Sequence, residues 1–324
     1  MDARIDLLVY IAELYYQQGL SQQRISKMTN MSRPTISRLL NEAKETGVVE
    51  IVVHSPILKN PQLSYAIRTT FGLRDAIVIA GTYDYDKALH RSAEAAANFL
   101  NTVLENNQTL GISWGKPLQY LCDAMKPTNY YNLNVVQMAG CLGTGNPHFD
   151  GLELALEISK KLDGTYSNIY APVYVDSELV YSYLIAEPQI ETTLKRALTT
   201  DVIVTGIGSL QDPESTLEKA GYYNDKQRME LLSRGGVGHL LARMFDKDGN
   251  ELNIPGRYTI TAPLSAMQHA QWSIGISASA MKAEAVLGAI HGKYLNMLVI
   301  DETLAYRMLE LAGAKADYLT SENP

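Results

Sequence analysis

The spacing of apolar residues divides the chain into two parts with different patterns. Over the first part, apolar side chains recur every three or four positions, which predicts amphipathic helices over 4–19, 21–28 and 32–47. The stretch 48–54 is rich in valine and isoleucine and predicts a short wing strand. The chain is therefore expected to begin with a small, mainly helical module.

Serine, proline and glycine residues mark the ends of these helices. Ser21 and Ser32 are placed as N-caps, and Pro34 lies in a first helical turn, where its missing N–H costs nothing. Gly19 and Gly47 end the first and third helices. The positions expected to be buried between the helices are Ile5, Leu8, Ile11, Ala12, Tyr15, Ile25, Met28, Ile36, Leu39 and Leu40.

After residue 62 the pattern changes to short β-prone runs that alternate with longer helical segments. The predicted helices are 87–106, 150–162 and 280–294. Hydrophobic strands that alternate with helices indicate a largely parallel sheet covered on both faces, as in Rossmann-like α/β domains. The predicted strands are 75–81, 109–115, 134–140, 170–175, 201–208, 258–263, 272–277 and 296–301.

Two prolines within 54–62 indicate a linker between the two parts. We therefore expect a first domain over 1–54, a linker over 55–62 and a large α/β domain over 63–324. In sheets of this kind, ligands bind beyond the carboxyl ends of the strands, where turns lead into helices.

Composition narrows the class of protein further. With 46% hydrophobic and 19% charged residues, the chain has the composition of a folded protein. Its two cysteines form no metal-binding or disulfide pattern, so we expect no metal site and a reducing, cytoplasmic location. We also expect no cofactor. The N-terminus lacks the basic start of a signal peptide, and no run of 18 apolar residues predicts a membrane span.

The charge distribution changes the picture given by the net charge. The chain carries a formal net charge of -7, which alone argues against nucleic acid as a partner. However, Ser21–Asn41 holds four basic residues and no acidic one. Because screening makes nearby charges count most, this local positive patch can still bind phosphates.

The second and third predicted helices, joined by a short turn, match a helix-turn-helix. In that motif the start of the second helix enters the major groove and contacts base edges. The expected base-contacting residues are Ser32, Arg33, Thr35 and Ser37, and the expected phosphate-contacting residues are Ser21, Arg24, Lys27 and Arg38. The alternative is a helical hairpin whose arginines only keep it soluble.

The segment 109–121 predicts a phosphate site. A strand there ends in a Gly-Ser-Trp-Gly turn, and a helix begins near Pro117. Backbone N–H groups of such a turn can approach an anion, and the helix dipole favours negative charge. The candidate effector-binding residues of this turn are Ser113, Trp114, Gly115 and Lys116. The alternative is a tight strand-to-helix turn in which Trp114 is merely packed.

The N-terminal run Leu14–Ile51 resembles the DNA-binding segment of the SorC family of bacterial sugar-responsive transcriptional regulators. It departs from the helix-turn-helix pattern at Ser26, where alanine is usual. The resemblance continues through the large domain, in order, at GISWG, VVQMAG, DVIVTGIGS, GVGHLLARMFDKDGN and AVLGAIHGKYLNMLVIDETLA. It implies an effector-binding domain similar to sugar-phosphate isomerases that binds a phosphorylated sugar.

The resemblance also implies roles for residues in other turns. Lys282 corresponds to a phosphate-binding lysine, although this chain lacks the glycine pair that usually precedes it. His239 stands where an acidic residue usually contacts sugar hydroxyls, so it is either a ligand contact or a structural histidine. Gly206 and Gly208 are expected under the ligand, because the third glycine of a dinucleotide-binding GxGxxG motif is absent. Gly140, in a glycine-rich loop, is expected over the sugar.

Together these features predict a transcriptional regulator of a carbohydrate catabolism operon whose operator binding responds to a phosphorylated sugar. A helix-turn-helix usually needs a symmetric partner, so a homodimer is expected, and the family resemblance implies a possible homotetramer. The first alternative is a phosphosugar isomerase-like enzyme with a fused N-terminal domain, but the sequence offers no convincing acid/base pair. A second alternative is an interaction protein whose N-terminal helices bind another protein.

Overall fold

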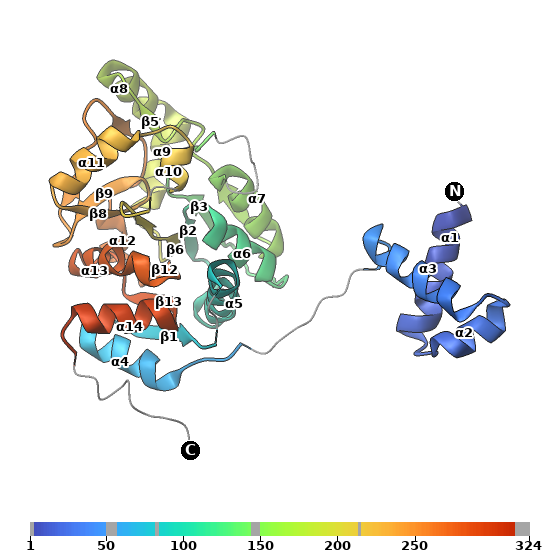
Figure 1. Cartoon of the computed structure of the whole chain (residues 1–324). Helices are drawn as coiled ribbons and strands as arrows, with labels where there is room; N and C mark the ends of the chain where they lie inside the picture. The colour runs from blue at the N-terminus through green and yellow to red at the C-terminus, as the bar shows by residue number, and fades with distance from the viewer. Residues whose placement is uncertain (1–2, 50–56, 82–83, 144–149, 213–214, 315–324) are drawn as a thin grey trace. The chain divides into compact units, whose positions relative to one another are not determined.

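The computed structural model describes residues 3–49, 57–81, 84–143, 150–212 and 215–314. Within the chain two compact units are distinguished, one up to Pro56 and one from Ile57 onward, and each is described by itself (Figure 1).

The N-terminal unit is a bundle of short helices. Its elements are α1 (Ala3–Ala12), a π-helical turn η1 (Glu13–Gln17), α2 (Gln22–Thr29) and α3 (Arg33–Glu45). The side chains of Ser21 and Ser32 accept hydrogen bonds from the backbone N–H groups of Arg24 and Thr35, each at 3.3 Å. Both predicted N-caps are therefore confirmed.

The core of this unit forms where the three helices meet. Eight apolar side chains are buried there, namely Leu8, Ile11, Leu14, Ile25, Ile36, Leu39, Leu40 and Ala43. The expected burial of Ile5 and Met28 is wrong, because these side chains are 49% and 56% exposed. Helix α2 has only two turns, and Ile25 is its one buried residue.

The turn between α2 and α3 explains the unusual serine at position 26. Asn30 ends α2 in the left-handed conformation, which asparagine tolerates. The Ser26 hydroxyl donates a hydrogen bond to the backbone carbonyl of Met31 at 2.5 Å. Ser26 therefore links α2 by a hydrogen bond to the turn that leads into α3. The wing strand predicted over 48–54 falls mainly on residues outside those described.

The large unit is built on a parallel sheet, as predicted, and this sheet has seven strands, of which β4 was not predicted. Its strand order is β1-β13-β12-β6-β2-β3-β4. The strands are β1 (Asp75–Ile79), β2 (Thr109–Ile112), β3 (Asn134–Gln137), β4 (Thr165–Ser167), β6 (Val202–Gly206), β12 (Trp272–Ile276) and β13 (Met297–Asp301).

Alternating side chains on these strands face two separate cores. On β13, Met297 and Val299 join the core with α5, α6 and α7, whereas Leu298 and Ile300 join the core with α4, α13 and α14. Both faces are thus covered by helices, as the continuous hydrophobic strands require. The helices of this unit are α4 (Pro61–Phe71), α5 (Tyr85–Val103), α6 (Lys116–Ala124), α7 (Gly151–Lys161), α8 (Glu178–Ala186), α9 (Pro188–Ala197), α10 (Thr216–Lys219), α11 (Asp225–Ser233), α12 (Ser265–His269), the 3₁₀ turn η3 (Ala280–Lys282), α13 (Ala283–His291) and α14 (Glu302–Leu311).

Two small antiparallel sheets complete the unit. The predicted strands 170–175 and 258–263 pair as a two-stranded ribbon, β5 (Tyr174–Val175) with β11 (Tyr258–Thr259), outside the parallel sheet. A four-stranded sheet in the order β10-β9-β8-β7 was not predicted as a unit. Its strands are β7 (Gly208–Ser209), β8 (Gly236–Leu240), β9 (Arg243–Asp246) and β10 (Glu251–Leu252).

The order of the parallel strands reverses between β2 and β6, which are neighbours. From β2 the chain proceeds to β3 and β4 on one side, and from β6 it proceeds to β12 and β13 on the other. The connections that leave the carboxyl ends of β2 and β6 therefore diverge. This point of reversal is where open α/β sheets form a ligand-binding crevice.

The segment 55–62, expected as a linker, ends inside the folded large unit. Lys59 forms a β-bridge with Ile79. Asn60 caps α4 by accepting a hydrogen bond from the backbone N–H of Leu63 at 3.0 Å, and its amide donates to Glu302 of α14 at 2.8 Å. Of the two prolines in 54–62, Pro61 therefore lies in the first turn of α4 and not in a linker.

We expect Asn60→Ala to lower the free energy of unfolding of the large unit by about 1–2 kcal/mol, because it removes an N-cap and leaves Glu302 without this partner. Urea denaturation followed by tryptophan fluorescence measures this, since Trp114 and Trp272 both lie in the large unit. The matched control is Gln189→Ala on the exposed surface of α9. Equal midpoints for the two variants would contradict the anchoring role of Asn60.

Candidate functional site: a polar cavity at the strand reversal and an exposed recognition helix

A cavity of about 760 Å³ lies at the point where the strand order reverses. It is lined by residues that follow β1, β2, β6 and β12, together with residues of the small antiparallel sheet. Eight of the nine predicted effector-binding residues line it, namely Ser113, Trp114, Gly115, Lys116, Gly206, Gly208, His239 and Lys282.

The ninth residue, Gly140, is absent from the cavity lining found among the described residues. A side chain at this position would lie 2.7 Å from the carbonyl oxygen of Ala171. The glycine therefore permits a close backbone approach, and its N–H donates to Ile260. This loop was expected to lie over the sugar, and its residues 144–149 are outside the described part of the chain.

The turn from β2 into α6 forms one end of the cavity. Gly115 has a φ of +97°, which favours glycine, and it precedes the first turn of α6. Because Gly115 has no side chain, it cannot cap the N–H groups at the start of this helix. The Ser113 hydroxyl lies 3.0 Å from that of Thr205 on β6. This turn therefore combines a hydroxyl, a helix N-terminus and little steric bulk, which suits an anion.

Close packing between α6 and β6 holds this turn in place. A side chain at Gly206 would lie 2.9 Å from the ring of Pro117, so the glycine allows the helix to approach the strand. Trp114 is buried and belongs to the hydrophobic core on one face of the sheet. It lines the cavity and is packed at the same time.

Lys116 is held by an acidic neighbour at the cavity edge. Its ammonium lies 3.0 Å from the carboxylate of Asp86, and this hydrogen bond raises the pKa of Lys116. Both side chains are about half exposed. Lys116 therefore carries a charge that is partly neutralised within the free protein.

Lys282 is a partly buried lysine of the cavity wall. Its ammonium lies 3.3 Å from the backbone carbonyl oxygen of Ile207 and 5.7 Å from the ring centre of Tyr85. Burial lowers the pKa of Lys282, and the carboxylate of Asp212 acts in the opposite direction. Lys282 is therefore not a solvent-exposed helix lysine, because its side chain is partly buried in the cavity wall.

The loop before Lys282 keeps a glycine-like conformation without the glycine pair. Ser279 has a φ of +82°, which is strained for a residue with a side chain. Its N–H donates to the carboxylate of Asp301 at 2.9 Å, and its hydroxyl accepts from the N–H of Met281. The buried carboxylate of Asp301 thus stabilises at Ser279 a positive φ that is normally adopted by glycine.

His239 forms part of the cavity floor. It pairs directly with Gly208 across the antiparallel strands β8 and β7, and its ring occupies the space above that glycine. A side chain at position 208 would lie only 1.9 Å from the Nε2 atom of His239. This nitrogen is buried without a hydrogen-bond partner among the described residues. Burial, with a smaller effect of Lys282, lowers the pKa of His239 to about 3.

The hairpin that carries His239 is strained next to the cavity. Leu241 and Ala242, which join β8 to β9, both have positive φ values, 50° and 61°. Such two-residue hairpin turns normally contain asparagine or glycine. The Tyr174 hydroxyl donates to the carbonyl of Ala242, and Leu241 lines the cavity. Packing therefore holds a turn that local preference disfavours.

Several cavity residues were not predicted. They come from the start of α5, from β6, from the segment after β7 and from the turn after β12, and they include Tyr85, Asp86, Thr205, Asp212, Ser215, Thr216, Lys219 and Ser279. Tyr85 and Asp86 follow the predicted strand 75–81, so the sequence could have predicted that they lie near the carboxyl end of that strand. For the other residues, no motif or spacing in the sequence indicated a place in the cavity.

The eight predicted DNA-contacting residues lie around α2, the turn and α3. Arg24, Lys27, Arg33 and Arg38 are exposed, as are Ser21 and Ser32. Thr35 and Ser37 are partly exposed. The Thr35 hydroxyl lies 2.8 Å from that of Ser32, so the N-cap orients it. The basic side chains are thus accessible on the elements that a helix-turn-helix presents to DNA.

The comparisons with known proteins fit both units. The profile of a family described as "Putative sugar-binding domain" matches residues 55–310. The chain belongs to this family. It is 29% identical to the deoxyribonucleoside regulator of Bacillus subtilis over 302 residues, which cover 92% of this chain and 96% of that protein. The resemblance to SorC-type regulators is confirmed.

A solved structure extends the likeness to almost the whole chain. The full-length sorbitol operon regulator SorC from Klebsiella pneumoniae matches with a TM-score of 0.73 and 26% identity, covering 95% of this chain and 99% of that one. No helix in the described part of the chain is long and apolar enough to cross a membrane. Nor do the described residues bring together three or more potential metal ligands from His, Cys, Asp and Glu.

We expect His239 to make the protein less stable at acid pH. An unfolded histidine takes up its proton near pH 6.5, whereas folded His239 does so only near pH 3. Folding therefore opposes protonation, and stability falls as the pH drops from 6.5 toward 3. Between pH 7.5 and pH 5 the loss through this residue is about 2 kcal/mol.

Urea denaturation at the two pH values measures this loss, which His239→Gln should remove. The matched control is His291→Gln at an exposed histidine, which should leave the loss in place. Histidine NMR titration provides a second measurement, independent of variant stability. A His239 ring that titrates near pH 6.5 in the folded protein would overturn the prediction.

Proposed function

We propose that this protein is a DNA-binding transcriptional regulator of a carbohydrate catabolism operon, and that a phosphorylated sugar in the large unit controls its operator binding. The observation that carries the proposal is the cavity at the strand reversal, where the β2–α6 turn and Lys282 face the same space. The names of the relatives support it, since they are regulators of sugar or nucleoside operons.

The cavity offers separate places for a phosphate and for hydroxyl groups. The Ser113–Gly115 turn and Lys282 supply donors and positive charge for a phosphate. His239 stays neutral at ordinary pH and has one free ring nitrogen, so it suits a sugar hydroxyl and not a second charge. A partly enclosed cavity that combines these groups can distinguish a sugar phosphate from either part alone.

For DNA binding, we propose that α3 enters the major groove. Ser32, Arg33, Thr35 and Ser37 would then meet base edges. The remaining candidates, Ser21, Arg24, Lys27 and Arg38, would contact phosphates. In this proposal residues 1–54 form the DNA-binding domain, 55–62 the connection and 63–324 the effector domain.

The regulator would act in the cytoplasm as a homodimer or homotetramer, because two half-sites of an operator require two recognition helices. An isomerase activity has less support, since the relatives carry regulator names. His239, with a pKa of about 3, is also too weak a base for proton transfer at neutral pH.

We expect Arg33→Ala to reduce discrimination between specific and random DNA by about 1–3 kcal/mol, because a bidentate arginine–guanine contact is lost. Fluorescence anisotropy measures it, with a duplex selected by the wild-type protein from a random library and a scrambled duplex. Arg38→Ala is the matched control, and it should weaken binding to both duplexes and lower the salt dependence. Unchanged discrimination in the Arg33 variant would refute the role of α3.

We expect sugar phosphates, and not free sugars, to raise the melting temperature of the protein. The probes are glucose 6-phosphate, fructose 6-phosphate, ribose 5-phosphate, 2-deoxyribose 5-phosphate and sorbitol 6-phosphate, compared with inorganic phosphate and the free sugars. Ser113→Ala and Lys282→Met should each weaken the binding of a stabilising probe at least tenfold.

The matched control for these variants is Lys195→Met, which removes an exposed lysine of α9. Stabilisation by free sugars alone would show that the phosphate assignment is wrong.

A further inference from the structure

One wall of the cavity is a short segment between β7 and α11. It contributes Ser209, Asp212, Ser215, Thr216 and Lys219 to the lining. In its described residues, 208–212 and 215–224, regular structure is limited to the two residues of β7 and the single turn of α10. The position of this wall therefore depends on contacts made from outside it.

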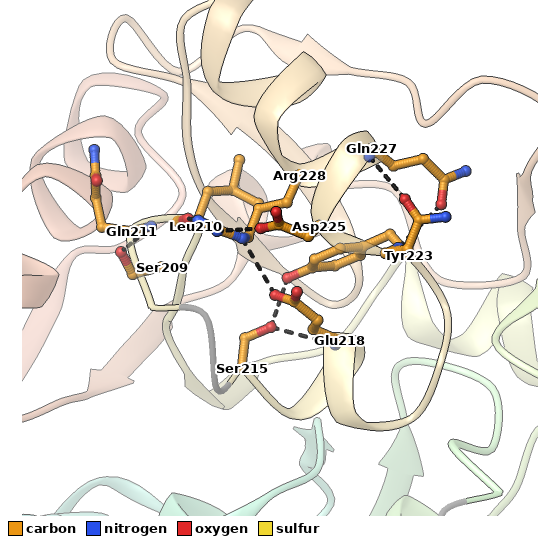
Figure 2. Close-up of polar contacts among 10 residues, drawn as sticks. Ser209, Leu210, Gln211, Ser215, Glu218, Tyr223, Asp225, Gln227 and Arg228 are labelled. Atoms are coloured by element: carbon orange, nitrogen blue, oxygen red, sulfur yellow. Dashed lines mark hydrogen bonds and ion pairs between the residues drawn. The ribbon is translucent and has the colours of Figure 1, made fainter.

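Arg228 of α11 contacts both ends of the wall, as Figure 2 shows. Its Nη1 atom donates to the backbone carbonyl of Leu210 at 3.2 Å. Its Nε atom lies 3.4 Å from the Oε2 atom of Glu218. The two side chains are only 13% and 17% exposed. The guanidinium thus bridges Leu210, near the start of the wall, and Glu218, near its end.

A second contact holds the middle of the wall. The hydroxyls of Ser215 and Tyr223 lie 2.5 Å apart (Figure 2), and the ring of Tyr223 is buried in the hydrophobic core. Ser215 also caps α10, since its hydroxyl accepts from the N–H of Glu218. Ser215 itself lines the cavity. The wall is therefore held at three points by residues 223 and 228.

Helix α11 is a firm support for these contacts. It begins with a reciprocal capping box between Asn224 and Gln227. Leu231 on its inner side is buried in the same core as Val237 of β8, the strand that carries His239. Arg228 is further fixed by Asp225 at 2.5 Å. Helix α11 therefore connects the wall to β8, the strand that forms part of the cavity floor.

We propose that Arg228 is a positioning residue of the effector site, and that with Glu218 it forms a latch that holds the wall at its binding distance from His239 and Lys282. This inference rests on the proposed function. Arg228 does not line the cavity, so it acts on the ligand only through the wall. A fixed wall spares the ligand the entropy cost of ordering the wall when it binds.

Arginine suits this latch better than lysine. The planar guanidinium donates in several fixed directions, so one side chain reaches Leu210, Glu218 and Asp225 together. A lysine at 228 keeps the charge but not the fixed geometry. The conservative variant therefore separates positioning from charge.

The experiment compares Arg228→Met, Arg228→Lys and the double variant Arg228→Met/Glu218→Met in the full chain. The matched control is Arg307→Met, which breaks an exposed ion pair on α14. Ligand affinity is measured by Trp114 fluorescence in a Trp272→Phe background, with whichever of the five named sugar phosphates binds the wild-type protein. Hydrogen exchange of amides 210–212 and 215–219 in the free protein reports the wall directly.

We expect Arg228→Met to weaken sugar phosphate binding at least tenfold and to speed amide exchange in the wall, with affinity for the selected duplex within twofold of wild type. Arg228→Lys should recover only part of the ligand affinity. The double variant should regain thermal stability, because no buried charge is left unpaired, but it should not regain ligand affinity.

Two results would overturn the latch. One is wild-type exchange in the wall of Arg228→Met. The other is ligand affinity that returns with stability in the double variant, which would make the pair structural only. If the wild-type protein binds none of the sugar phosphates, the proposed function fails, whereas the exchange measurement still decides whether Arg228 holds the wall. If Arg228→Met does not fold, Glu218→Gln replaces it.

Discussion

The pairing of β2 with β6 is the constraint on which the site depends. These adjacent parallel strands send the chain in opposite directions, so no connection covers the space beyond their carboxyl ends. Ser113 directly follows β2 and Thr205 lies on β6, and their hydroxyls are 3.0 Å apart. The close approach of α6 to β6 at Gly206 then directs the helix N-terminus toward the same space.

The electrostatics of the cavity follow from its partial burial. Withdrawal from water lowers the pKa of both Lys282 and His239, but with different outcomes. His239 becomes neutral throughout the physiological range, and Lys282, whose pKa starts far higher, is supported by Asp212. The cavity thus places the Lys282 amine, which Asp212 helps to keep protonated, and the neutral imidazole of His239 at different positions. That asymmetry matches a ligand with one charged end.

The sequence predicted the parts of the fold that local patterns determine. Continuous hydrophobic runs located the central parallel strands, and serine caps located the helices of the N-terminal unit. The small antiparallel sheet was missed because its hairpin turns at Leu241 and Ala242, where no asparagine or glycine signals positive φ. Met28 was misplaced for a related reason, since periodicity gives the face of a helix but not how far its partner helices extend.

The site was predictable where resemblance or turn chemistry marked it, and not where tertiary contacts alone create it. Ser113 and Lys282 stand at strand-to-helix turns, which a sequence displays. Arg228 is 10 residues from Glu218 (228 - 218 = 10) and joins it only because α10 and α11 fold against one core. No spacing rule connects such a residue to a cavity it does not line.

A regulator needs more than occupancy of its cavity, because a ligand changes DNA affinity only if it binds two states of the protein differently. The centre of the parallel sheet is a poor place for two states, since its inner strands are buried and have a paired strand on each side. The wall between β7 and α11 is a better one. Its described residues have little regular structure, and its position depends on the contacts of Tyr223 and Arg228, so a change in those contacts can give it a second position. Its contacts lead through α11 to β8 and its neighbours. A ligand that binds one position of this wall more tightly than another would meet the requirement for two states.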